Sequence, residues 1–209
     1  MKAAAASTVF GCASVLLSYP DSDFHEDLRS VERAAASGLS RGTARSGLIS
    51  AASALGGLSV MDAAARYVET FDLRRGTSLY LTYYRHGDTR ERGMALAALV
   101  QVYRTAGFEL VGGELPDHLP ALLELAAVSS KGAAVLSEHA AAIAAVRTTL
   151  EESSSPYAGA FDAVCSALGP ISKADAEFLR RYRAEGPPSE RVGLEPFAPP
   201  EVVQRVSLR

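Results

Sequence analysis

Cysteine is scarce in this chain, and its scarcity narrows the kinds of site that the sequence can hold. The two cysteines, Cys12 and Cys165, are too few for a zinc site and do not form a CxxC pair. Each of them falls on the apolar side of an expected helix. Buried free thiols in a reducing compartment are therefore the simplest interpretation.

The chain also lacks the short motifs that mark common enzyme classes. It has no GxxxxGK(S/T) phosphate loop, no GxSxG nucleophile elbow and no GxGxxG dinucleotide turn. Its histidines are His25, His86, His118 and His139, and none forms an HxxxH or HExxH pair. A metal-dependent hydrolase centred on Asp117 and His118 would need further ligands at helical spacings. We therefore expect neither catalysis nor a metal ion bound by the chain.

Long apolar runs are missing as well. No stretch approaches the ~20 consecutive apolar residues that a membrane-spanning helix needs. The start of the chain faintly resembles a signal peptide, but only 11 residues precede Cys12 in its lipoprotein-like VFGC sequence. Val9, Cys12 and Leu16 instead repeat at helical spacing, which predicts a first core helix ending at Tyr19 and Pro20. We therefore expect a cytoplasmic protein without stable membrane insertion.

Charge of either sign is moderate, and lysine is rare. Charged residues make up 22% of the chain, and the formal net charge is −3. Proteins that bind nucleic acids are usually basic with clustered Lys and Arg, so no nucleic-acid partner is expected. The hydrophobic fraction of 48% is typical of a globular protein, and 209 residues fit one domain that buries its own core.

Strand patterns are nearly absent, whereas apolar residues recur at the three- and four-residue spacing of helices. These stripes predict an all-α fold, a single-domain helical bundle of about nine or ten helices over residues 1–184. No repeat of fixed length favours a solenoid. The expected helices span residues 7–18, 23–36, 43–55, 60–73, 77–85, 89–106, 118–129, 132–151, 156–168 and 173–184.

Several of the expected helices carry residues that favour a start or a stop. A Ser, Thr, Asp or Asn before a helix accepts hydrogen bonds from its first amides, and an acidic residue three positions later completes a capping box. Gly107 is expected to end the helix over residues 89–106. The predicted N-terminal caps are Asp88 with Glu91, Ser172 with Asp175, Ser155 before Pro156, and Asp117.

The last segment of the chain, residues 185–209, differs in composition from the rest. It holds five of the ten prolines, at positions 187, 188, 196, 199 and 200. Proline cannot continue a helix, and it restricts the residue before it to extended conformations. We therefore predict that this Pro-rich tail is extended or disordered.

Tyr67 and Phe71 lie four residues apart in the helix that is expected to begin after Ser59. Residues at this spacing share one face of a helix. Two interpretations remain open for the pair. The side chains either pack in the core or line a groove that accepts a helix of another protein.

A cluster of aromatic and basic residues follows this helix. Tyrosine and arginine are enriched at protein interfaces, and similar residues stack on RNA bases. The interspersed Asp72 and Asp88 argue against RNA, so an interface and ordinary helix packing are the main alternatives. The cluster comprises Tyr80, Tyr83, Tyr84, Arg74, Arg75, Arg85 and His86.

The sequence ELPDHLP, residues 114–120, has the pattern of a loop that enters a helix. Asp117 suits an N-cap, and Pro120 is tolerated in a first turn. In a second interpretation, Glu114, Asp117 and His118 lie at one rim of a site, where the acidic groups meet basic residues of a partner peptide.

Together these segments resemble a known family. YVETFD, RRGTSLYLTYYRHGDTRERG and AGFELVGGELPDHLP occur in this order. They are similar to the nitrate reductase molybdenum-cofactor assembly chaperones, the NarJ group of the TorD/DmsD superfamily. The likeness is strongest over residues 67–127, and LLSYP near the start and LEPFAPPE in the tail extend it weakly.

The superfamily has two sparse signatures, and both have counterparts here. In the first, an aromatic residue is followed, after two others, by Leu-Phe; Tyr67 and Phe71 match, and Thr70 replaces the leucine. The second is Glu-Pro-x-Asp-His, in which Leu115 is inserted before the proline, the form usual in the nitrate reductase subgroup. The residues that match the second signature are Glu114, Pro116, Asp117 and His118.

The resemblance implies an all-helical, TorD-like fold without catalysis. It implies a chaperone that binds the N-terminal segment of the apo catalytic alpha subunit of respiratory nitrate reductase. The molybdenum bis-guanine-dinucleotide cofactor (Mo-bisMGD) and an iron–sulfur cluster are installed in that client, and no cofactor stays on the chaperone. Cofactor-delivery proteins are further partners that the resemblance allows. The alternative is an export chaperone for the twin-arginine signal peptide of another molybdoenzyme.

The sequence leaves one structural question open. The two signatures are more than 40 residues apart, and nothing in their spacing decides whether they line one groove. The predicted partner-binding residues are Tyr67, Phe71, Arg75, Tyr84, Asp88, Glu114, Pro116, Asp117 and His118.

Overall fold

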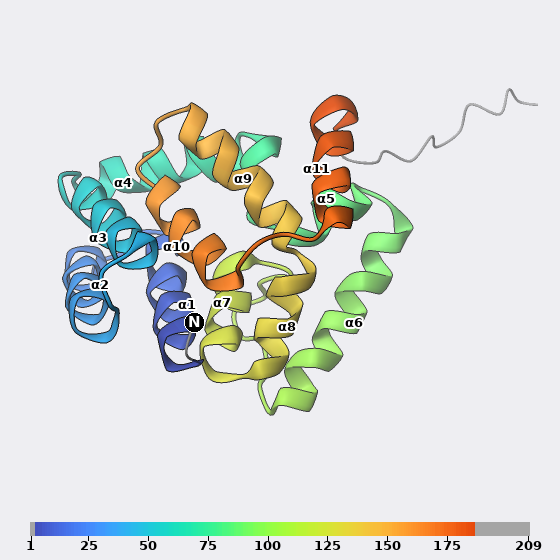
Figure 1. The fold of residues 1–209 in the computed structure, drawn as a ribbon, viewed down its shortest axis with the longest axis horizontal. Coiled ribbons are helices and arrows are strands. Elements are labelled where there is room, and N and C mark those ends of the chain that lie inside the picture. Colours follow the sequence, from blue (N-terminus) through green and yellow to red (C-terminus); the bar gives the residue numbers. More distant parts are fainter. Residues whose placement is uncertain (1–2, 187–209) are drawn as a thin grey trace, which may run out of the picture.

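Helices make up nearly all the regular structure of the part of the chain that the computed structural model describes, residues 3–186. Within this range there is no β-strand, and the one isolated β-bridge joins Tyr80 to His118. The predicted all-α fold class is therefore confirmed (Figure 1). The Pro-rich tail lies outside the described residues from position 187 onward, so its conformation stays a prediction.

The helices follow the expected order with small shifts at their ends. Between α4 and α5 lie a π-helical turn, Val68–Asp72, and a 3-10 turn, Arg75–Thr77. The α-helices are α1 (Ala3–Leu17), α2 (Phe24–Gly38), α3 (Thr43–Gly56), α4 (Val60–Tyr67), α5 (Leu81–His86), α6 (Arg90–Ala106), α7 (Leu119–Val128), α8 (Ser130–Glu138), α9 (Ala140–Glu152), α10 (Ala158–Leu168) and α11 (Lys173–Glu185).

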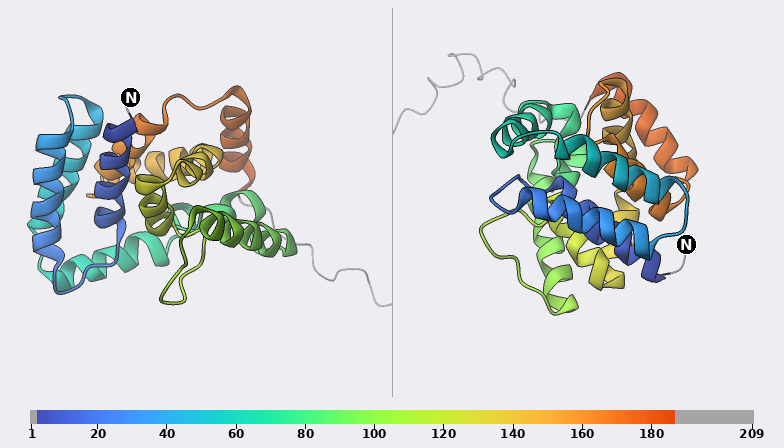
Figure 2. Two further views of the ribbon diagram at one scale, coloured as in Figure 1. Left: turned by 90° about the horizontal axis from the view of Figure 1, so that it is seen from below. Right: turned by 90° about the vertical axis from the view of Figure 1, so that its left-hand side faces the viewer.

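Helix α1 lies inside the bundle and contacts α2, α3, α7 and α10 (Figure 1). Most of its large apolar residues, including Val9, Leu16 and Leu17, are buried, which confirms the predicted first core helix. Helices α5, α6 and α11 lie on the opposite side of the bundle from α2 and α3. In the left view of Figure 2, the loop after α6 projects from the body.

Helices α3 and α10 approach each other closely because each contributes a glycine at the crossing. Gly47 of α3 and Gly159 of α10 face one another, and a methyl group built on either would overlap the carbonyl oxygen of the other. This pair of helices also shares the most extensive contact in the domain. Two glycines thus bring the two backbones together.

The predicted core stripes are buried to different extents. Leu136, Ile143, Val146 and Leu150 are almost fully buried, as are Phe161 and Val164 of α10. Helix α6 is an exception, since its predicted stripe of Leu96, Leu99, Val100, Tyr103 and Ala106 is buried only at Leu99 and Tyr103. That helix therefore packs sparsely on the domain, and α11, which has no buried residue, packs more sparsely still.

Two of the predicted helix ends are confirmed. Ser172 and Asp175 form the predicted capping box, and Gly107 ends α6 with a φ of 86°. The predicted box of Asp88 with Glu91 is wrong, because Thr89 occupies the N-cap position and the Asp88 carboxylate pairs with Arg92 instead.

The predicted N-cap at Ser155 is also wrong. Helix α10 begins three residues later, at Ala158. Ser155 and Pro156 belong to the turn before it, in which Ser154 has a φ of 50°. The Ser155 carbonyl accepts a hydrogen bond from the Ala158 amide at 3.1 Å, and the Ser155 hydroxyl accepts one from the Tyr157 amide at 3.4 Å, so Ser155 closes the turn before the helix and does not occupy its N-cap position.

A single helix was expected over residues 132–151, but the chain breaks at His139 between α8 and α9. His139 has φ −101° and ψ 11°, outside the helical range, and serves as C-cap of one helix and N-cap position of the next. Burial lowers the pKa of its ring to about 4, and the neighbouring Arg85 and His86 lower it further.

Both cysteines are free, as expected. Cys12 is buried in α1, and burial raises the pKa of its thiol. Cys165 is half-buried in α10, and burial raises the pKa of its thiol to about 11. Both thiols are therefore held in the protonated, unreactive form.

Within residues 3–186, no single helix is long and apolar enough to cross a membrane. By length and composition alone, α3 passes that test only when taken together with the segment Val60–Asp72, and the two are bent by 118°.

The glycine crossing predicts opposite effects for two substitutions of the same kind. Gly47→Ala forces a methyl group into the α10 backbone and should lower the free energy of unfolding by about 1–3 kcal/mol. Gly93→Ala is the matched control in α6, where no atom lies within 4 Å of the added carbon. It should raise the free energy of unfolding by up to ~1 kcal/mol. Urea denaturation measures both, and equal effects would contradict the close crossing.

His139 predicts a loss of stability in mild acid. The ring titrates at 6.5 in the unfolded chain and at about 4 in the folded protein, so the unfolded state binds the proton first. This contribution is complete above pH 6.5 and is lost as the pH falls toward 4. Between pH 7.5 and pH 5 the loss should be about 2 kcal/mol. Urea denaturation of the wild type and His139→Gln at both pH values tests it, and an equal loss in the variant would exclude His139 as the cause.

Candidate functional site

The two signature segments meet in space at a short backbone contact. The Leu81 amide donates to the Asp117 carbonyl at 3.1 Å, and the Leu119 amide donates to the Leu79 carbonyl at 2.8 Å. These hydrogen bonds form the bridge between Tyr80 and His118. The loop before α7 is thereby held in register with the segment before α5.

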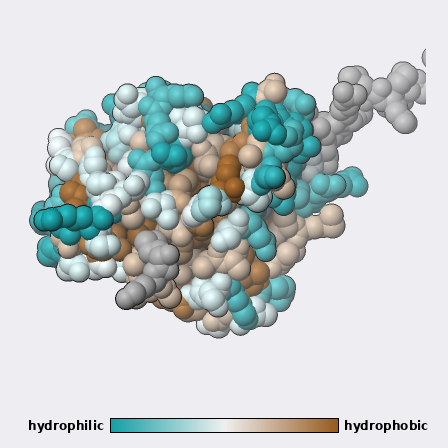
Figure 3. All heavy atoms as spheres, in the orientation of Figure 1, coloured by the Kyte–Doolittle hydropathy of each residue, from teal (hydrophilic) through white to brown (hydrophobic). Residues whose placement is uncertain are grey.

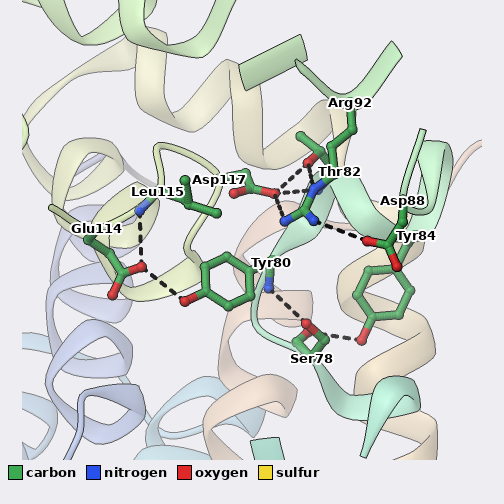
Figure 4. A network of polar contacts seen from close by, with 9 residues as sticks. All are labelled: Ser78, Tyr80, Thr82, Tyr84, Asp88, Arg92, Glu114, Leu115 and Asp117. Atoms are coloured by element: carbon green, nitrogen blue, oxygen red, sulfur yellow. Dashed lines mark hydrogen bonds and ion pairs between the residues drawn. The ribbon is translucent and has the colours of Figure 1, made fainter. Parts of the chain in front are cut away.

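Asp117 is fully buried beneath this bridge. Its Oδ2 accepts hydrogen bonds from the Thr82 amide, at 3.1 Å, and from the Thr82 hydroxyl. The Arg92 guanidinium lies 3.7 Å from the same oxygen (Figure 4). Among the described residues, Oδ1 has no hydrogen-bond partner.

The prediction that Asp117 caps α7 is therefore wrong. His118 occupies the N-cap position, and its side chain makes no capping bond. A buried carboxylate needs strong partners, and the amide and hydroxyl of Thr82 supply them at a distance of 35 residues along the chain. The carboxylate thus joins two segments instead of starting one helix.

Arg92 completes this polar network from α6. It reaches Asp88 at 3.5 Å as well as Asp117, and its guanidinium lies over the rings of Tyr80 and Tyr83 at 5.9 and 6.0 Å. Sequence reasoning missed both Thr82 and Arg92. The four-residue spacing from Asp88 to Arg92 on a helix was a usable signal for their pairing.

Tyr80, Glu114 and His118 form a second polar group beside the network. The Tyr80 hydroxyl and the Leu115 amide each donate to Glu114 Oε1 at 3.0 Å. The rings of Tyr80 and His118 lie 5.2 Å apart, and His118 Nδ1 is 3.6 Å from Glu114 Oε2. The Glu114 carboxylate is therefore oriented by fixed donors.

Burial controls the protonation of this group. It raises the pKa of Tyr80 to about 12, with a further contribution from the hydrogen bond to Glu114. Burial also lowers the pKa of His118, while the carboxylates of Glu114, Asp117 and Asp72 oppose that shift. Tyr80 is therefore a hydrogen-bond donor across the physiological range of pH.

Tyr67 and Phe71 are core residues that also reach a surface cavity. They are only 5% and 4% exposed. Their rings lie 5.0 Å apart, with Tyr19 5.4 Å from Tyr67 and Tyr157 4.7 Å from Phe71. Phe71 lies in the π-helical turn after α4, a kind of irregularity that is frequent at functional sites.

The two signatures line one cavity, which answers the question that the sequence left open. Its volume is about 400 Å³. Tyr67 and Phe71 contribute from one signature, and Glu114 and His118 from the other. We call this cavity the signature hollow. Its lining comprises Ser18, Tyr19, Tyr67, Phe71, Asp72, Leu79, Tyr80, Glu114, His118, Pro120, Ala121 and Glu124.

Sequence reasoning assigned no role in the site to Tyr19, Leu79, Ala121 and Glu124. They come from the end of α1, the segment before α5, and the first turns of α7. Tyr19 lies in LLSYP near the start of the chain, and Leu79 lies in RRGTSLYLTYYRHGDTRERG, but neither segment indicated a role in the site. Helix packing, rather than any local motif, brings these residues to the signature hollow.

The remaining predicted residues lie beside the signature hollow. Tyr84 is fully buried, and its hydroxyl donates to the Ser78 carbonyl at 2.9 Å. Pro116 is buried and lines a neighbouring cavity of about 420 Å³ between the C-terminal half of α6 and the loop after it, whose lining also includes Glu114. Arg75 and Asp88 line another neighbour of about 260 Å³.

We call that last cavity the arginine hollow. It borders the signature hollow, because Phe71, Asp72 and Tyr80 line both. Its full lining is Phe71, Asp72, Arg74, Arg75, Ser78, Tyr80, Tyr83, Asp88 and Arg92.

Two further cavities contain none of the predicted residues. One, of about 430 Å³, lies between α9 and α10, where Arg147 pairs with Asp162 at 2.5 Å and with Glu151 at 2.7 Å. The other runs along α3. Figure 3 shows that hydrophobic residues are exposed between hydrophilic ones on the face of α9 and α10. Surface hydrophobicity by itself therefore does not single out the signature hollow.

Across the described range, no group of three or more His, Cys, Asp or Glu side chains is placed so that it could hold a metal ion. Asp117 and His118 in particular do not belong to such a group. The neighbours of Asp117 are Thr82 and Arg92, which are hydrogen-bond donors, and His118 lies beside the ring of Tyr80 and a single carboxylate, that of Glu114.

Comparison with known proteins gives a consistent set of relatives. The family described as "Nitrate reductase delta subunit" matches residues 36–163, a range that contains both signatures. The probable nitrate reductase molybdenum cofactor assembly chaperone NarJ of Bacillus subtilis is 32% identical over 161 residues, which cover 76% of this chain and 87% of that protein. The corresponding NarJ of Escherichia coli is 41% identical over 104 residues, 49% of this chain and 44% of that protein.

A longer relative contains a similar region. The nitrate reductase-like protein NarX of Mycobacterium tuberculosis is 42% identical over 163 residues, which cover 75% of this chain but only 24% of that protein. The chain thus spans about a quarter of the length of that relative.

The network around Asp117 predicts unequal roles for the two carboxylates that contact Arg92. Asp117→Ala leaves the Thr82 donors and the guanidinium without their buried acceptor and should cost about 3–5 kcal/mol of unfolding free energy. Asp88→Ala removes a carboxylate whose side chain is 73% exposed and should cost less than ~1 kcal/mol. Chemical denaturation compares them, and similar losses would contradict the central role of Asp117.

Proposed function

Because the chain belongs to the nitrate reductase delta subunit family, we propose that it is a dedicated assembly chaperone for a nitrate reductase. In this proposal it binds the N-terminal segment of the apo catalytic alpha subunit and assists insertion of Mo-bisMGD and assembly of the complex. The relatives from Bacillus subtilis and Escherichia coli bear the name of molybdenum cofactor assembly chaperones, which supports this role.

One observation carries the proposal: both signatures contribute to the signature hollow. Tyr67, Phe71 and Leu79 provide an apolar floor, and Asp72, Glu114 and Glu124 provide carboxylates around it. A cavity with this lining suits one or two apolar side chains of a peptide flanked by basic residues. Amphipathic helices are recognised in this way, by apolar anchors in a groove with charges that set the register.

The size of the signature hollow fits a transient complex. A cavity of about 400 Å³ accepts a few side chains rather than a folded domain. Small interfaces are typical of complexes that form and dissociate, whereas obligate partners bury much larger areas. A chaperone has to release its client once the cofactor is in place, so moderate affinity is an advantage.

The predicted residues divide into two proposed roles. Tyr67, Phe71, Glu114 and His118 would contact the client directly from the signature hollow. The buried residues would support the site from behind, with Asp117 holding the two segments together. The other members of this supporting set are Tyr84 and Pro116, while Arg75 and Asp88 would act from the arginine hollow.

Within this proposal the protein is not an enzyme, and Mo-bisMGD is cargo for the client rather than a cofactor of the chaperone. We propose the cytoplasm as the place of action. Val9, Leu16 and Leu17 of α1 are buried, and the helix packs against α2, α3, α7 and α10, which supports a core helix.

Filling the signature hollow should abolish client binding. Ala121 of α7 lines it and is half-buried, so Ala121→Trp places a bulky ring in the cavity while leaving the Asp117 network intact. The affinity for the N-terminal peptide of the alpha subunit should fall at least about ten-fold, which corresponds to a loss of about 1.4 kcal/mol of binding free energy. Isothermal titration calorimetry measures this.

Ala97→Trp on the exposed side of α6 is the matched control and should bind like the wild type. Unchanged affinity in folded Ala121→Trp would contradict the assignment of the site. A twin-arginine signal peptide of another molybdoenzyme serves as the competing ligand. If that peptide binds and the alpha-subunit peptide does not, the export-chaperone alternative is correct.

A further inference from the structure

The signature hollow and the arginine hollow are neighbours that share part of their lining. Both are lined by Phe71, Asp72 and Tyr80. On one side of Tyr80 its hydroxyl bonds to Glu114 at 3.0 Å, and on the other Arg92 lies over its ring at 5.9 Å. Figure 4 shows Tyr80 between these two groups. A bound segment that fills the first cavity therefore has the second within reach.

The two cavities differ in charge. The lining of the signature hollow includes the carboxylates of Asp72, Glu114 and Glu124 but no lysine or arginine. The arginine hollow includes three arginines against the two carboxylates of Asp72 and Asp88. A ligand that spans both cavities thus meets an acidic end and a basic end.

Of the three arginines that line the arginine hollow, Arg75 is the one that could pair with a carboxylate of a bound ligand. Arg92 is engaged by Asp117 and Asp88, and Arg74 reaches Glu69 at 3.3 Å. Arg75 is exposed on the 3-10 turn, and within residues 3–186 it forms no salt bridge. Its guanidinium is free to receive a carboxylate from outside the domain.

We propose that the arginine hollow is a second subsite for the same client segment, in which Arg75 receives an acidic side chain. This rests on the proposed function, in which the basic and apolar residues of that segment occupy the signature hollow. One tyrosine side chain separates the subsites, so the acidic residue should lie roughly one to two helical turns from the basic one, about 5–11 Å along a helix. The arrangement fixes the register of the client and favours segments that carry both charges.

A double-mutant cycle between protein and peptide tests the second subsite. The probes are the N-terminal peptide of the alpha subunit and a version in which its acidic side chains are changed to glutamine. The wild type should bind the glutamine version about two- to five-fold more weakly, the range of an exposed ion pair. Arg75→Gln should bind both peptides equally, and Arg29→Gln, an exposed arginine of α2, should respond like the wild type.

The outcomes separate the two proposals. If the wild type binds both peptides with equal affinity, or if Arg75→Gln keeps the wild-type ratio, the second subsite is wrong and the chaperone function stands. If the wild type binds neither peptide, both proposals fail. An alpha-subunit segment without an acidic residue within two turns of a basic one would also overturn the second subsite. Raising the salt concentration should remove the difference between the peptides if the contact is ionic.

Discussion

The buried Asp117 carboxylate is the interaction on which the rest of the site depends. A charge withdrawn from water is tolerated only with strong partners, and Thr82 and Arg92 supply them from α5 and α6. This requirement holds the loop before α7 against the segment before α5. The bridge between Tyr80 and His118 fixes the register of these two segments. Glu114 and His118 therefore face the same cavity as Phe71.

The two sides of this network differ in how tightly they are packed against the core. Tyr67, Phe71 and Tyr157 form a buried aromatic floor that continues into the core. Helix α6, which supplies Arg92, is buried only at two positions. Helix α6 is therefore held mainly by the ion pairs of Arg92, while few of its apolar side chains are buried. Such an arrangement keeps the charged groups in place and leaves one wall of the neighbouring cavities less constrained.

Local chemistry explains which sequence predictions succeeded. The capping box of Ser172 and Asp175 joins residues three apart, so no distant group competes for them. Asp117 satisfies the same local rule, yet the amide and hydroxyl of Thr82, 35 residues away along the chain, bind its carboxylate away from the helix end. A capping bond is worth about 1 kcal/mol, less than a buried carboxylate loses when it is left without partners. The tertiary contact therefore prevails.

The sequence by itself determined the all-α fold, most helix positions, the core stripes and the family, because apolar periodicity and short motifs act over a few residues. Only the tertiary structure decided that residues 67–71 and 114–118 line one cavity, and that an arginine-lined cavity borders it. The reason is that partner choice for a buried charge depends on distances between segments far apart in the chain. No local pattern records those distances.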